Sequence, residues 1–147
     1  MNIRVLKKLM PVALLLLASF QIAPAQGERR IKPSPGSITG TYSFRNPSAE
    51  NSLSAQWLPG GKVKIYLYAS WIGSVEMGNV RNGEIRATLP LKNNVAVYES
   101  GQCRITIRFR GRRAIVTQNE NDCDFGLNVL ADGTYIKRSS RRPKFDF

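Results

Sequence analysis

Four stretches of the chain alternate between hydrophobic and polar side chains with a period of two residues. In the second stretch, Val63, Ile65 and Leu67 alternate with lysines and tyrosines. Successive side chains of a β-strand point to opposite faces of a sheet, so this alternation predicts strands that bury one face. The four stretches are residues 52–58, 62–70, 84–91 and 103–110.

Turn-forming residues separate these stretches and divide the rest of the chain into short segments. Asn82-Gly83 is the strongest signal, because both residue types tolerate the positive φ of a two-residue hairpin turn. The other turn signals are Pro59-Gly60-Gly61, Asn93-Asn94, Gly111-Arg112 and Asp132-Gly133. The pattern predicts eight or nine strands, near residues 40–45, 51–58, 62–70, 75–81, 84–90, 94–99, 102–110, 113–118 and 133–138.

Two similar segments open and close this series of strands. Gly40-Thr41-Tyr42 begins the first strand, and Gly133-Thr134-Tyr135 begins the last. If these strands pair, the sheet closes and leaves no exposed edge for aggregation. We therefore predict an all-β fold, an antiparallel meander that forms a closed barrel of eight or nine strands. A barrel of this size is filled by side chains or holds one small ligand.

The first 25 residues have the features of a secretory signal peptide. A short basic segment precedes an apolar run, which ends in the small-residue cleavage site Ala23-Pro24-Ala25. The apolar run is shorter than the roughly 20 residues that span a bilayer, which favours a cleaved signal over a membrane anchor. We expect a secreted or periplasmic protein. Its segments would be the signal peptide 1–25, a flexible lead-in 26–39, the barrel 40–138 and a basic tail 139–147.

The chain has two cysteines, Cys103 and Cys123. An isolated pair in an oxidising compartment usually forms a disulfide, and the CxxC spacing of many redox-active pairs is absent. A hairpin turn at Gly111-Arg112 would place residue 103 opposite residue 120, and a short fold-back would bring Cys123 to Cys103. We predict a structural disulfide between them.

The composition excludes several kinds of catalytic site. The chain contains no histidine, so Ser-His-Asp and Cys-His arrangements cannot form. The sequence also shows no Ser-x-x-Lys, phosphate-binding loop, dinucleotide or zinc motif. We expect a protein that is not an enzyme and that has no catalytic residues, no cofactor and no metal site.

An acidic cluster near Cys123 leaves two alternatives open. Paired carboxylates could perform glycosidase-type acid–base chemistry, and together with asparagine oxygens they could bind calcium. The sequence matches the spacing of neither kind of site, which favours a solvated loop whose charges balance nearby arginines. The cluster contains Glu120, Asp122 and Asp124, with Asn119 and Asn121 beside them.

Basic residues outnumber acidic residues by 22 to 10, and the net charge of +12 would fall to +9 without the three basic residues of the signal peptide. This balance is compatible with an anionic glycan, a cell-envelope component or a protein target, whereas export argues against nucleic acid as a native partner. Arginine suits sulfate and phosphate groups because its guanidinium donates two parallel hydrogen bonds. Alternatively, the arginines are ordinary exposed residues whose charge promotes solubility. The candidate anion-binding residues are Arg104, Arg108, Arg110, Arg138, Arg141 and Arg142.

The two tryptophans, Trp57 and Trp71, are the largest apolar side chains of the chain. A tryptophan at the mouth of a barrel can line a ligand pocket. Packing in the core or at the rim is the more common role. We therefore treat both residues as candidates for a pocket or for the rim of the barrel.

The segment from Cys123 to the basic tail resembles a group of uncharacterised small exported bacterial proteins. Their C-terminal pattern is Cys-Gly-Phe-Gly-x-Asn-Val-x-Ala-x-Gly-x-Tyr, ahead of a basic tail that contains proline. The matching residues are Cys123, Phe125, Gly126, Asn128, Val129, Ala131, Gly133 and Tyr135. Asp124 departs from the glycine of the pattern. The general plan also resembles lipocalin-like barrels and small periplasmic lysozyme inhibitors, and the resemblance carries over no functional residue.

Together these features favour a protein that acts by binding. The leading hypothesis is an exported inhibitor or binding protein with an anionic or polysaccharide partner. One alternative is a carrier of a small apolar ligand inside the barrel. A carboxylate-based enzyme is the least favoured alternative.

Overall fold

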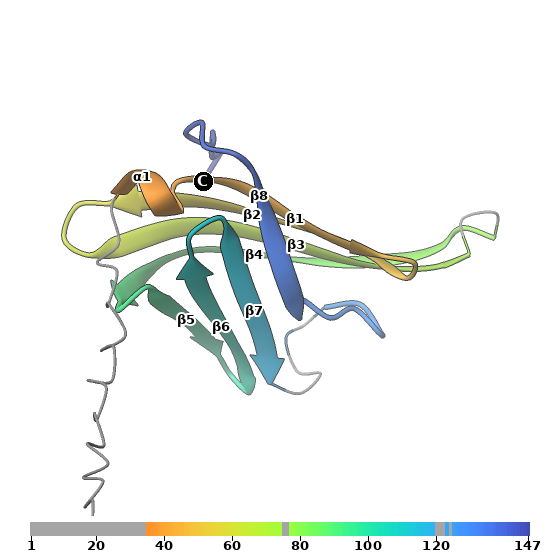
Figure 1. Cartoon of the computed structure of the whole chain (residues 1–147). Helices are drawn as coiled ribbons and strands as arrows, with labels where there is room; N and C mark the ends of the chain where they lie inside the picture. Colours follow the sequence, from red (N-terminus) through yellow and green to blue (C-terminus); the bar gives the residue numbers. More distant parts are fainter. Residues whose placement is uncertain (1–34, 75–76, 120–122, 124) are drawn as a thin grey trace, which may run out of the picture. The chain divides into compact units, whose positions relative to one another are not determined.

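The computed structural model describes residues 35–74, 77–119, 123 and 125–147, all of which belong to the second of two units, Ile31–Phe147. The predicted signal peptide and the acidic residues at 120, 122 and 124 lie outside the described residues. The described chain forms one short helix and eight antiparallel strands that close into a barrel (Figure 1). The elements are α1 Pro35–Ile38, β1 Gly40–Asn46, β2 Ala49–Leu58, β3 Lys62–Ser74, β4 Asn79–Lys92, β5 Val95–Ser100, β6 Cys103–Arg110, β7 Arg113–Asn119 and β8 Gly133–Ser139.

The barrel confirms the predicted fold class, but one of the predicted turns is absent. Each strand pairs with the next along the chain, and β1 pairs with β8 to close the sheet. The predicted turn at Asn82-Gly83 is wrong, because both residues lie inside β4 and pair with Ser70 and Ala69 of β3. Residues 79–81 and 84–90 of the two predicted strands therefore belong to one strand, β4.

A glycine that suggested a turn serves a packing role instead. A Cβ atom at Gly83 would overlap the ring of Phe125, which lies on the strand at this point. Glycine in a strand interior often marks such a close approach. Phe125 comes from the loop between β7 and β8, so no pattern within β4 itself could have revealed the contact.

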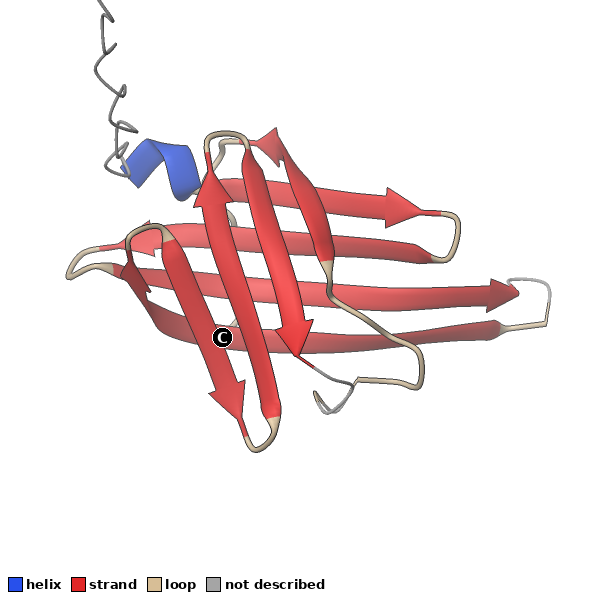
Figure 2. Cartoon of the chain, turned by 60° about the horizontal axis from the view of Figure 1, so that its bottom comes forward, coloured by secondary structure: helices blue, strands red, loops and turns tan. Residues whose placement is uncertain are grey.

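Hydrophobic side chains of all eight strands fill the barrel. The alternating positions of β6, from Cys103 to Phe109, are buried, while the arginines between them are exposed. Figure 2 shows the strands in two groups that cross one another. The largest fully buried side chains are Tyr42, Tyr135, Ile38, Leu53, Ile65, Leu67, Ile105, Ile107, Val63 and Asn51.

The two Gly-Thr-Tyr segments have equivalent structures at the starts of β1 and β8. The hydroxyl of Tyr42 donates to the backbone oxygen of Ile38 at 2.6 Å, and that of Tyr135 donates to the backbone oxygen of Ala131 at 2.8 Å. Gly40 and Gly133 have φ angles of 147° and 151°, a conformation that side chains rarely allow. Each tyrosine thus ties its strand to the chain four residues earlier.

The similarity extends to the residue before each glycine. The Thr39 hydroxyl accepts a hydrogen bond from the backbone N–H of Trp57 in β2, at 3.1 Å. A carboxylate oxygen of Asp132 accepts one from Gln118 in β7, also at 3.1 Å. Each segment is therefore joined to a neighbouring strand by a side-chain acceptor, which satisfies backbone donors where the ladder ends.

A short helix precedes the first strand, within the segment predicted as a lead-in at 26–39. Residues Pro35–Ile38 form a single helical turn, and the Ile38 side chain is buried in the core. The Lys137 ammonium donates to the backbone oxygen of Ser37 at 2.8 Å. A one-turn helix produces no repeating pattern, so only the lone Ile38 could have indicated this packing.

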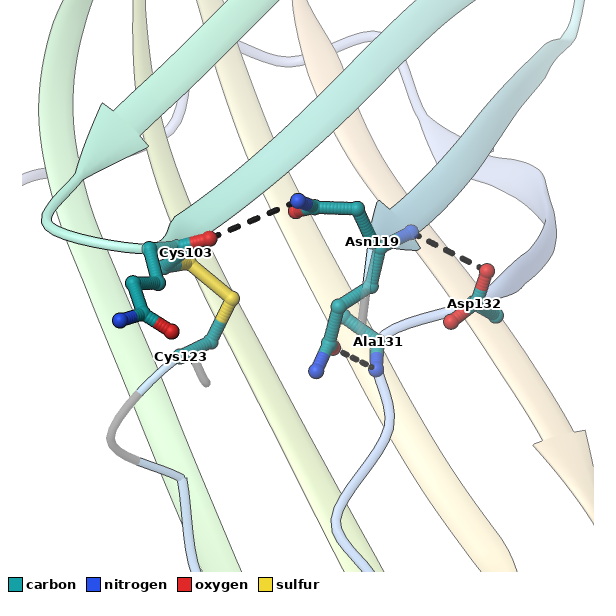
Figure 3. The surroundings of a disulfide bond; sticks show 7 residues. Cys103, Asn119, Cys123, Ala131 and Asp132 are labelled. Atoms are coloured by element: carbon teal, nitrogen blue, oxygen red, sulfur yellow. Dashed lines mark hydrogen bonds between the residues drawn. A yellow bond between two sulfur atoms is a disulfide. The ribbon is translucent and has the colours of Figure 1, made fainter. Parts of the chain in front are cut away.

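The loop between β7 and β8 packs across the other end of the barrel, and the disulfide anchors it. Cys103 and Cys123 are joined as predicted, with their Cα atoms 4.4 Å apart. Arg104 pairs with Asn119, which is the register that the predicted hairpin turn at Gly111-Arg112 requires. Farther along, Asn51 donates to Leu130, and the Ala131 N–H donates to the Gln118 side chain. Figure 3 shows the disulfide with Asn119, Ala131 and Asp132 near it.

We predict that loss of the disulfide destabilises the barrel without changing its fold. The bond closes a loop across a separation of 20 residues, which corresponds to about 3 kcal/mol on the chain-entropy model. Cys123→Ser should lower the free energy of unfolding in urea by about this amount. Free thiols in the native oxidised protein, or an unchanged unfolding midpoint, would contradict the assignment.

We also predict that Gly40→Ala is far more damaging than Gly111→Ala. A Cβ at Gly40 would overlap the Ser139 backbone oxygen across the β1–β8 seam, whereas a Cβ at Gly111 meets no atom within 4 Å. Gly111→Ala should cost only the strain of a left-handed conformation, about 1–2 kcal/mol. Urea unfolding of both variants measures the difference, and equal losses would show that the seam tolerates a side chain.

Candidate anion-binding surface

Exposed arginines gather on the outer face of β6, β7 and β8, at the end of the barrel that holds the β6–β7 turn. Arg110 of β6 lies opposite Arg113 of β7, which in turn lies opposite Ile136 of β8. Arg108 is two residues from Arg110 on the same face. Because neighbouring strands are roughly 5 Å apart, the three arginines form one compact group.

Arg138 extends this group to the closing seam of the barrel. Its Nε donates to the Ser43 hydroxyl of β1 at 2.7 Å. Ile136 of β8 pairs with Ser43 of β1 on one side and with Arg113 of β7 on the other. Arg138 is two residues from Ile136 on the same face of β8, so it lies near Arg113. Arg112, in the turn, donates to the backbone oxygen of Lys137 at 3.2 Å.

The last two candidate arginines follow β8 directly. The backbone N–H of Arg141 donates to the Ser139 hydroxyl at 3.1 Å, which keeps this part of the tail at the end of the strand. Arg141 and Arg142 are both exposed. We call the whole set the arginine surface: Arg108, Arg110, Arg112, Arg113, Arg138, Arg141 and Arg142.

The sixth residue of the predicted set, Arg104, does not belong to this group. It lies at the opposite end of β6 and forms an ion pair with Glu99 at 2.8 Å. Conversely, the predicted set omitted Arg112 and Arg113, which the structure adds. The hairpin register across Gly111-Arg112 was the signal that could have identified Arg113, because it places that residue opposite Arg110.

The carboxylates of the described chain are engaged away from the arginine surface. Glu50 pairs with Arg45, Glu84 and Asp146 both pair with Arg86, and Glu99 pairs with Arg104. Asp132 accepts a backbone hydrogen bond in the loop before β8. Within the described ranges, none of these carboxylates forms an ion pair with a residue of the arginine surface.

The two tryptophans lie on β2 and β3, away from the arginine surface. Both are half-buried and pack against the hydrophobic core. Trp71 also lies under the guanidinium of Arg81, 5.5 Å from the ring centroid, and its ring covers Gly73. Both positions are consistent with packing at the rim of the barrel. Neither residue lines the cavity between the C-terminal segment and strands β3 and β4.

A cavity lies outside the barrel, where the C-terminal segment meets β3 and β4. Its volume is about 360 Å³, and its lining combines aromatic and charged side chains from these strands and from the segment. The lining residues are Tyr66, Arg86, Lys144, Phe145, Asp146 and Phe147. The sequence did not indicate this site, since only the folded tail brings residues 144–147 onto the outer face of the sheet.

Two titratable side chains, those of Lys137 and Tyr42, lie close together inside the barrel. Lys137 is buried, and its ammonium lies 5.4 Å from the centroid of the Tyr42 ring. Burial, and then the nearby charge of Arg112, lower the pKa of Lys137. Burial alone raises the pKa of Tyr42 to about 12. These contacts join β8, β1 and the short helix at one end of the barrel.

Comparison with known proteins gives no relative: no protein-family model, curated protein or solved structure matches this chain. The resemblance to small exported bacterial proteins therefore stays a prediction. Among the described residues, no helix has the length and apolar character needed to cross a membrane.

We predict that alkaline pH weakens the barrel through Tyr42. Its pKa in the folded protein is about 12, above its ordinary value of 10, so its contribution to stability is complete below pH 10. That contribution is lost as the pH rises from 10 to about 12. Absorbance titration should show late ionisation of Tyr42, and the late phase should shrink in Tyr42→Phe. A single early phase, as in the chain unfolded by guanidinium, would contradict the prediction.

Proposed function

We propose that the protein is an exported, non-catalytic binding protein whose arginine surface holds an anionic polymer, such as a sulfated or phosphorylated glycan of a cell envelope. The pair Arg110 and Arg113 is the observation that carries this proposal. The two exposed arginines lie directly opposite each other, and no carboxylate of the described chain forms an ion pair with either.

Such a pair has a cost in the free protein. Like charges directly opposite each other on a sheet are destabilising, on a scale of about 0.2–1 kcal/mol. An anion bound between the two guanidinium groups would replace this repulsion with charge-assisted hydrogen bonds. The arrangement of Arg110 and Arg113 therefore reduces stability but favours binding of a negatively charged group.

The extent of the surface suits a polymer better than a single small anion. Neighbouring strands are about 5 Å apart, and alternate residues of a strand are about 7 Å apart. Arg108, Arg110, Arg113 and Arg138 thus present charges at intervals comparable to those along a sulfated or phosphorylated chain. The arginines after β8 extend the surface beyond the sheet.

The alternative functions receive less support from the structure. A carrier needs an empty interior, whereas Tyr42, Leu53 and Tyr135 are among many large side chains that occupy the core. A basic inhibitor of a basic lysozyme would have to overcome repulsion between the partners. The carboxylate-based enzyme stays a hypothesis, because its three acidic residues lie outside the described part of the chain.

We predict opposite effects of Arg113→Thr on binding and on stability. The substitution should weaken binding of a heparin-derived octasaccharide at least tenfold, since a hydrogen bond to a charged group contributes about 1.5–3 kcal/mol. It should also raise the free energy of unfolding by a few tenths of a kcal/mol, because it removes the repulsion with Arg110. Titration calorimetry and urea unfolding measure the two quantities.

Arg45→Thr is the matched control. Arg45 is also an exposed strand arginine and lies near the C-terminal end of β1. It forms an ion pair with Glu50, its partner residue on β2. Its substitution should leave octasaccharide binding unchanged and should not raise stability. Binding should weaken steeply with added salt, because exposed charges are screened. Equal loss of binding in both variants, or salt-independent binding, would overturn the proposed site.

A further inference from the structure

The C-terminal segment lies on the outer face of β3 and β4, where cations meet its two phenylalanine rings. The Lys64 ammonium donates to the backbone oxygen of Phe147. It also lies 5.1 Å from the centroid of the Phe145 ring and 4.3 Å from that of Phe147. The two rings meet edge to face, 5.4 Å apart. One lysine thus contacts both aromatic side chains of the segment.

Arg86 is the second cation that contacts the C-terminal segment, and side chains of β3 and β4 hold it in place. Its guanidinium lies 5.3 Å from the Tyr66 ring centroid, and its Nη2 is 3.1 Å from a Glu84 oxygen. The Tyr66 hydroxyl donates to the other Glu84 oxygen at 2.8 Å, and this hydrogen bond is the main cause that raises the pKa of Tyr66. These contacts within the sheet orient Arg86 before any segment binds.

The oriented arginine then meets an acidic and an aromatic side chain of the segment. Its Nη1 is 3.8 Å from a carboxylate oxygen of Asp146, and its guanidinium is 5.8 Å from the Phe147 ring centroid. Together, Lys64 and Arg86 contact an aromatic residue, an acidic residue and a second aromatic residue in succession. Cation–π contacts and the ion pair would select this chemistry over a basic or purely aliphatic segment.

The segment is held loosely enough to be displaced. The Asp146 side chain is 85% exposed, and 41% of Phe147 is exposed. Exposed ion pairs contribute little to stability. The cavity of about 360 Å³ between the segment and the strands is within the size range of ligand sites. The contacts therefore resemble those of a bound peptide more than those of a packed core.

We propose that the face around Lys64, Tyr66 and Arg86 is a binding site for peptides in which an acidic residue separates two aromatic residues. Residues Phe145–Phe147 of the protein occupy this site as an intramolecular competitor. The site differs from the arginine surface in its location and in its ligand, so it does not depend on the function proposed above. A tethered competitor acts at an effective concentration in the millimolar range, which a partner peptide has to overcome.

The full chain with both Phe145→Ala and Phe147→Ala tests this proposal. The substitutions remove the rings that contact Lys64 and Arg86 and so free the site. A fluorescent pentapeptide PKFDF, amidated at its C-terminus, should bind this variant at least fivefold more tightly than it binds the unaltered chain. Fluorescence anisotropy measures both affinities, and urea unfolding verifies that the barrel is intact.

Further substitutions in the freed variant locate the site. Lys64→Ala or Arg86→Ala should weaken PKFDF binding at least tenfold. Lys62→Ala is the matched control, because Lys62 projects from the same face of β3 and, in the described chain, makes none of these ring or backbone contacts. The charge-reversed peptide PKFKF should not bind.

Three results would overturn the proposal. The first is absence of PKFDF binding to the freed variant at millimolar peptide. The second is an equal loss of affinity in Lys62→Ala and Lys64→Ala. The third is equal binding of PKFKF and PKFDF. If the double variant does not fold, Asp146→Lys in the full chain is the substitute, and the same three results apply to it.

Discussion

The pairing of β1 with β8 is the contact on which the rest of the structure depends, although its register contains only three residue pairs. Closure removes both edges of the sheet, and two buried tyrosine hydroxyl bonds hold the strands that form the seam. The side chains of Tyr42 and Tyr135 then fill space inside the barrel. Because the core is occupied by the protein's own side chains, the positions open to a partner lie on the outer surface.

The outer surface carries two kinds of positive charge. On β6–β8, arginines face one another without carboxylate partners in the described residues, and we propose that an external anion binds them. On β3 and β4, Lys64 and Arg86 are instead surrounded by aromatic rings and acidic groups. We therefore propose two binding sites on the outer surface, one for a polyanion and one for an aromatic, acidic peptide.

Local pattern predicted much of the fold. The period of two located the strands, the two similar triplets indicated closure, and the hairpin arithmetic at Gly111-Arg112 placed the disulfide. The errors involve contacts between distant segments. Asn82-Gly83 has the composition of a turn, but Phe125 requires a glycine inside β4. The candidate site was predicted only in part, since the strand register and the folded tail decide which arginines lie together.

Nuclear magnetic resonance of the isotopically labelled protein gives the sharpest test of whether the arginine surface binds an anionic polymer. A sulfated octasaccharide would be titrated while the guanidinium Nε–H resonances are followed. We predict that the resonances of Arg110, Arg113 and Arg138 shift most and saturate together, while those of Arg45 and Arg104 stay in place. Shifts confined to the ion-paired arginines, or no saturable shift at low salt, would contradict it.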